Sequence, residues 1–130
     1  MIVMSIRTDK PGAELGIYDD QKQLAYDEWE AHRRLAETIN KKIEEILNLL
    51  SISLKDVQGV VVYEGPGSFT GLRIGFSVAN ALAYGLKIPI VAAGGSEWIN
   101  KGIKNLLAGQ SDKIALPKYG APPHITEPRK

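Results

Sequence analysis

The pattern of hydrophobic and polar residues divides the chain into a strand-rich start and a longer part in which helices and strands alternate. Residues 2–6 and 13–18 are apolar runs, and residues 23–30 alternate imperfectly. Turn-forming residues separate these runs at 7–12 and 19–20. The pattern predicts three strands in an antiparallel meander, with the third strand near a sheet edge.

The hydrophobic period changes after residue 30. Apolar residues then recur at helical spacing and predict a helix over 31–50, namely Leu35, Ile39, Ile43, Ile46, Leu47 and Leu50. A short turn follows in which Ser53 can cap toward Asp56. Beyond it we expect a buried strand at 59–63, a helix at 70–86, a strand at 87–93, a helix that Ser96 caps and that ends near Leu107, and a last short strand at 113–116.

This order, βββαβαβα, predicts an α/β fold with a mixed sheet and helices on its faces. We expect one domain over residues 1–108. Residues 109–130 read as an extended tail, because prolines accumulate in its second half.

A glycine-rich stretch joins the strand at 59–63 to the helix at 70–86. Gly65, Pro66 and Gly67 cannot extend the strand, and Ser68 or Thr70 can cap the helix. Such a loop presents backbone N–H groups at the positive end of a helix dipole, which suits an anion. It lacks the spacing of a Walker or dinucleotide loop. A tight turn that packs a helix closely on a sheet explains it equally well.

The stretch Gly65-Pro66-Gly67-Ser68-Phe69-Thr70-Gly71-Leu72-Arg73-Ile74-Gly75 closely resembles the signature of the bacterial TsaB family, also called YeaZ. The resemblance implies an actin/Hsp70/sugar-kinase-like (ASKHA) half-domain. It also implies a non-catalytic scaffold that supports a TsaD-like enzyme in threonylcarbamoyladenosine modification of tRNA. The implied partners are a TsaD-like subunit, a TsaE-like ATPase as a further candidate, a second copy of the chain when alone, and tRNA only indirectly.

Two departures from the family bear on chemistry. Family members carry Ile-Asp-Thr at the first hairpin, where this chain has Ile6-Arg7-Thr8, and arginine cannot coordinate magnesium. The chain also stops near the end of the first of two family domains, whose interface forms the nucleotide cleft. We therefore expect no cofactor, unless a nucleotide binds at a shared interface. The alternative function is a stand-alone nucleotide- or anion-binding module that uses Gly65, Gly67, Ser68, Thr70, Arg7 and Thr8.

Two helix faces offer a surface for the implied partner. Small residues recur every four positions in the second helix, as Gly71, Gly75, Ala79 and Ala83, with Arg73 beside them. Leu35, Ile39 and Ile46 border the facing stripe of the first helix. These eight residues form the predicted partner interface, although packing of the small residues on the chain's own sheet remains open.

Composition narrows the remaining classes. The 130 residues are 44% hydrophobic and 24% charged, with a net charge of +1 and no cysteine. These values suit a soluble cytoplasmic protein, exclude thiol chemistry and demand neither nucleic acid nor a membrane. His32 has no second histidine at i+4, so we propose no metal site, and no arrangement of residues suggests an active hydrolase.

Overall fold

A computed structural model describes residues 1–31, 34–112 and 115–116. Its elements, in chain order, are β1 (Ile2–Arg7), β2 (Gly12–Asp19), β3 (Lys22–Glu30), α1 (Leu35–Leu49), the 3₁₀ turn η2 (Leu54–Asp56), β4 (Gly59–Tyr63), α2 (Phe69–Leu86), β5 (Ile90–Ala93) and α3 (Trp98–Leu107). The predicted order βββαβαβα and the α/β class are confirmed.

The five strands form one mixed sheet in the order β3-β2-β1-β4-β5. β1 pairs antiparallel with β2 and parallel with β4, and β4 pairs parallel with β5. The meander therefore builds one half of the sheet, and the strand–helix crossovers build the other. β3 lies at an edge, as the imperfect alternation of its residues predicted.

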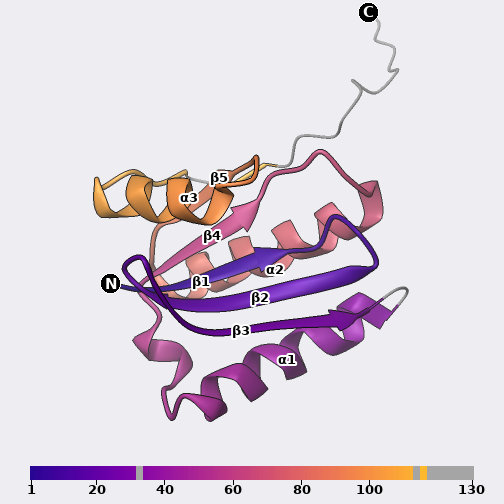
Figure 1. The fold of residues 1–130 in the computed structure, drawn as a ribbon, viewed down its shortest axis with the longest axis horizontal. Helices are drawn as coiled ribbons and strands as arrows, with labels where there is room; N and C mark the ends of the chain where they lie inside the picture. The colour runs from indigo at the N-terminus through magenta and orange to yellow at the C-terminus, as the bar shows by residue number, and fades with distance from the viewer. Residues whose placement is uncertain (32–33, 113–114, 117–130) are drawn as a thin grey trace, which may run out of the picture.

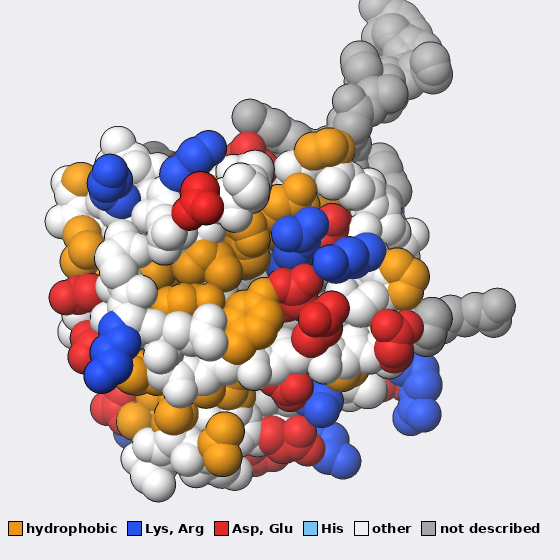
Figure 2. All heavy atoms as spheres, viewed as in Figure 1, with side chains coloured by type: hydrophobic (Ala, Val, Ile, Leu, Met, Phe, Trp, Pro, Cys, Tyr) orange, Lys and Arg blue, Asp and Glu red, His pale blue; other side chains and the backbone are white. Residues whose placement is uncertain are grey.

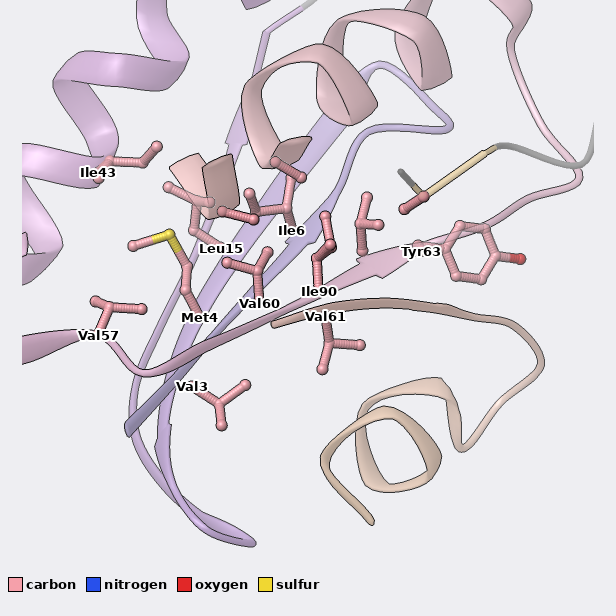
Figure 3. Packing of buried hydrophobic residues seen from close by; sticks show 14 of the residues in the cluster. Val3, Met4, Ile6, Leu15, Ile43, Val57, Val60, Val61, Tyr63 and Ile90 are labelled. Carbon is pink, nitrogen blue, oxygen red and sulfur yellow. The ribbon is translucent and has the colours of Figure 1, made fainter. Parts of the chain in front are cut away.

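Helices cover both faces of the sheet (Figure 1), with α1 and α2 on one face and α3 on the other. Successive side chains of a strand point to opposite faces, so the central strands bury both sides. Figure 3 shows Val60 on the side of α1 and α2 and Val61 on the side of α3. Both valines are fully buried. Near-continuous apolar runs such as 60–63 are what burial on two faces requires.

Local capping explains where two of the elements begin. Ser68 is the N-cap of α2 and accepts a hydrogen bond from the Gly71 N–H. Ser53 and Asp56 form a reciprocal capping box at η2, as expected. The predicted cap at Ser96 is wrong, because Glu97 occupies the N-cap position of α3 and its side chain makes no capping bond.

The structure departs from the expected boundaries at two other places. α1 begins at Leu35 rather than at residue 31, with Arg34 at the N-cap. Half of the strand expected at 113–116 lies outside the described residues, and Ala115 and Leu116 are not in a strand. His32 and the tail beyond residue 116 also lie outside the description. Within the described part of the chain, no helix has the length and hydrophobicity needed to cross a membrane.

α3 leaves the β2–β3 half of its face without a covering helix. Figure 2 shows hydrophobic side chains gathered there, between α3 and β3. Gly16 allows side chains to pack closely on this part of the sheet, because a methyl group at that position would overlap the side chains of Ser5, Tyr18 and Tyr26. Two tyrosine side chains thus lie against the glycine and cover part of this half of the sheet.

Candidate functional site: the glycine loop and the α1–α2 face

The glycine loop is tied to the end of β1 and the turn after it by two hydrogen bonds, and a third closes within the loop. The Ser68 N–H donates to the Asp9 carbonyl at 2.8 Å, and the Thr8 hydroxyl donates to the Gly71 carbonyl at 2.8 Å. The Gly71 N–H is used by Ser68 Oγ. Three groups that could engage an anion, the N–H of Ser68, the N–H of Gly71 and the Thr8 hydroxyl, are therefore already bonded within the chain.

Arg7 is paired in the same way. Its guanidinium donates to both carboxylate oxygens of Asp9, at 2.7 and 3.2 Å, and its Cζ lies 4.0 Å from the centre of the Tyr63 ring. The bond to Asp9 raises the pKa of Arg7 above its usual value. A cation that is neutralised and stacked on a ring offers little charge to a ligand.

Among the remaining residues of the predicted anion set, the two glycines serve the conformation and close packing of the loop. Gly65 is buried and has a φ of 104°, which favours glycine. A methyl group at Gly67 would overlap Asp9. Ser68 and Thr70 line a cavity of about 380 Å³ together with Thr8. The module that binds an anion through this loop is therefore not favoured. Among the described residues, no three His, Cys, Asp or Glu side chains lie close enough to hold a metal ion.

The small-residue stripe of α2 faces the chain's own sheet. Ala79 is fully buried and Ala83 nearly so. Methyl groups added at Gly71 and Gly75 would overlap the backbone and the side chain of Thr8, respectively. The prediction that this stripe forms a groove for a partner is wrong, because it is the surface on which α2 approaches β1.

Three residues of α1 require the same correction. Leu35, Ile39 and Ile46 were expected at a partner surface, but each is at most 4% exposed in the core. One sheet face covers this stripe completely. Of the eight predicted interface residues, Arg73 is the one whose exposed side chain lies on the outer side of the helix pair.

The exposed hollows lie instead along the seam between α1 and α2. A cavity of about 520 Å³ near the helix N-termini is lined by Ala36 of α1 and by Arg73, Ile74, Ser77 and Val78 of α2. A second cavity, of about 510 Å³, includes Asn40, Glu44 and Leu82. We call these residues the seam face.

Sequence reasoning missed the apolar part of the seam face. Ile74, Val78 and Leu82 recur every four residues and are only partly buried. The same spacing that marked the small-residue stripe could have revealed this second stripe. Between the two, the pattern alone does not say which one faces the sheet.

Comparison with known proteins places the chain in a family. Residues 29–98, more than half of the chain, match the family model described as TsaD: tRNA N6-adenosine threonylcarbamoyltransferase. The chain belongs to the TsaB/TsaD family. The tRNA N6-adenosine threonylcarbamoyltransferase of Geotalea daltonii is 37% identical over 100 residues, which cover 75% of this chain and 28% of that protein.

TsaB proteins are among the relatives too. The tRNA threonylcarbamoyladenosine biosynthesis protein TsaB of Escherichia coli is 31% identical over 91 residues, covering 70% of this chain and 39% of that protein. The structure of YeaZ from Pseudomonas aeruginosa superposes with a TM-score of 0.67 at 22% identity, over 72% of this chain and 43% of that one.

These relatives confirm the recognition of the TsaB (YeaZ) family, and the superposition confirms the ASKHA-like fold. The chain spans less than half the length of each relative described here.

Proposed function

We propose that the chain is a non-catalytic subunit of the TsaB type that supports a TsaD-like enzyme in threonylcarbamoyladenosine modification of tRNA. The observation that carries this proposal is the seam face. It is an exposed and hollowed surface on the outer side of α1 and α2, and no other element of the described chain covers it. The chain alone pairs with a second copy through this face, and a TsaD-like subunit competes for it.

The composition of the seam face suits a helix–helix contact. Ser77 of the seam face begins a row of exposed small residues on α2, which Ala81 and Gly85 continue beside the seam. A methyl group at Gly85 would meet nothing within 4 Å. Small side chains let a partner helix approach closely, while Ile74 and Val78 provide apolar surface to bury beside them. Association costs offset part of this gain, so the area alone sets no affinity.

The loop contacts support the absence of catalysis in this subunit. Arg7 occupies the position of the superfamily aspartate and is paired with Asp9. Thr8 donates its hydroxyl to the chain's own backbone. A TsaE-like ATPase and tRNA enter this proposal only through the TsaD-like subunit.

The experiment places a charge on the seam face. Ser77→Glu should weaken self-association and binding to a purified TsaD-like protein, each by at least about tenfold, because a carboxylate buried in a helix contact loses its hydration. Mass in solution and titration against the TsaD-like protein measure the two effects.

Ser96→Glu is the matched control. It introduces the same side chain at an exposed site beside α3, on the opposite face of the sheet. It should change neither measurement. If Ser77→Glu also leaves both unchanged while the melting temperature is retained, the interface lies elsewhere.

A further inference from the structure

The outer edge of β3 is open. β3 ends the five-stranded sheet, and no segment of the described chain pairs with its outer side. It is nine residues long, the longest of the described strands, and holds no proline. An edge of this kind exposes a row of backbone N–H and C=O groups that can pair with an added strand. β3 therefore offers a template for one more strand.

The register of β2 and β3 decides which residues of β3 point their backbone groups outward. The Ala31 N–H donates to the Pro11 carbonyl at 2.9 Å, one step beyond Glu30 in the same register. Bonded and non-bonded pairs alternate along an antiparallel ladder, so Glu30 belongs to a non-bonded pair and its N–H and C=O face away from β2. The same holds for Glu28 and Tyr26, because the pairing is regular over these residues.

The side chains of these three residues share the face of the sheet that carries α3. Tyr26 lies opposite Gly16 on β2, and Gly16 lies opposite Ser5 on β1. Ser5 in turn lies opposite Val61, which points to the side of α3 (Figure 3). Residues directly opposite each other in a sheet point to the same face. Figure 2 shows acidic side chains gathered on this face beside the hydrophobic ones.

The charges along this edge favour a basic ligand. Glu28 lies directly opposite Glu14, and like charges in that position repel. A methyl group at Gly12 would lie 3.3 Å from a Glu28 oxygen and 3.6 Å from a Glu30 oxygen, so these two carboxylates lie close together. Cationic side chains beside them would relieve the repulsion. Nucleic-acid phosphates would be repelled, and a second β3, with three acidic residues and one lysine, complements the edge poorly.

We propose that the outer edge of β3 binds an extended segment of a partner protein by strand addition. The backbone of the segment pairs with Tyr26, Glu28 and Glu30, and alternate side chains of the segment lie beside theirs. In an antiparallel addition, the segment carries two basic residues separated by one residue, and an apolar or aromatic residue two positions after the second of them. The pairing uses neither the seam face nor the glycine loop, so it is independent of the function proposed above.

A synthetic peptide tests the charge pattern. Labelled and end-blocked Thr-Lys-Val-Lys-Val-Tyr-Thr should bind the parent chain at least about tenfold more tightly than the same peptide with glutamate in place of both lysines. Glu28→Lys should reduce this preference at least about threefold. Glu97→Lys makes the same change at an exposed residue beside α3 and should keep the preference. Equal binding of the two peptides by the parent would refute the charge recognition.

Methylation of the peptide backbone separates strand addition from simple attraction between charges. In the bound peptide, the N–H of the second lysine points to β3, whereas the N–H of the valine before it points away. N-methylation of that lysine should weaken binding at least about tenfold, because it removes a hydrogen bond and places a methyl group against the edge. N-methylation of that valine should change binding by less than about twofold. Both measurements use the parent chain, and equal effects of the two methyl groups would overturn the strand addition.

Discussion

At the scale of single residues, the close approach of α2 to β1 depends on glycine. Gly75→Ala should lower the free energy of unfolding by about 1–3 kcal/mol, because the added methyl group would overlap the Thr8 side chain. Urea denaturation measures the change. Gly85→Ala is the matched control in the same helix, where the space is open. It should raise stability by about 0.5–1 kcal/mol, through helix propensity. Equal effects at the two positions would contradict the inward orientation of Gly75.

The phenol of Tyr26, a residue that is 38% exposed and hydrogen-bonded to Glu14, makes a second residue-scale prediction, on alkaline stability. Partial burial, and then the hydrogen bond to Glu14, raise the pKa of Tyr26 above its usual range. The unfolded chain releases this proton near pH ~10, while the folded chain retains it. The contribution of Tyr26 is thus fully present below that pH, and the free energy of unfolding falls as the pH rises above it.

Tyr26→Phe should therefore flatten the alkaline loss of stability, measured by urea denaturation between pH ~9 and ~11.5. Tyr84→Phe removes a phenol that is 89% exposed and should leave the profile of the parent. A profile that is identical in all three proteins would rule out a contribution from the Tyr26 phenol.

At the scale of elements, capping distinguishes two serines that look alike in the sequence. Ser68→Ala should destabilise the chain by about 1 kcal/mol, because the Gly71 N–H loses its acceptor at the start of α2. Ser96→Ala should stay within about 0.5 kcal/mol of the parent, as an exposed residue that makes no cap. Thermal unfolding of the two variants provides the comparison, and a larger loss from Ser96→Ala would contradict the assignment of the caps.

α1 is oriented by its buried apolar stripe and by contacts from one of its flanks to β3. Its apolar stripe lies in the core, and Trp29 of β3 donates its indole N–H to Thr38 at 3.0 Å. The Lys42 Nζ of α1 lies 3.5 Å from the Asp27 Oδ2 of β3. These contacts hold one flank of α1 on the edge strand. The opposite flank, toward α2, is the one that borders the seam.

At the scale of the whole molecule, the isolated chain should release no phosphate from ATP above the rate without protein. Arg7 stands where the superfamily has a metal-binding aspartate, and it is paired with Asp9. Thr8 donates its hydroxyl to the Gly71 carbonyl. A phosphate-release assay at saturating ATP measures this. Turnover that saturates with ATP and that Thr8→Val abolishes would contradict the proposed non-catalytic role.

The sequence by itself determined the element order, the edge position of β3 and the family, and it limited the cap of α2 to Ser68 or Thr70. Each of these depends on neighbouring residues, on hydrophobic period, turn chemistry or a contiguous motif, and such features are readable along the chain. The eleven residues from Gly65 to Gly75 were sufficient for the recognition that the curated relatives confirm.

Only the tertiary structure decided which of two stripes on α2 faces the sheet. Gly75 and Ala79 face inward because Thr8 and the core come close to them, whereas Ile74 and Val78 border the seam. Likewise, Asn80 is hydrogen-bonded to Ala115, which lies 35 positions further along the chain. The charge of Arg7 is neutralised by Asp9 in the turn after β1. Helical spacing shows which residues share a face, but which face is buried depends on the partner that covers it, and long-range packing supplies that partner.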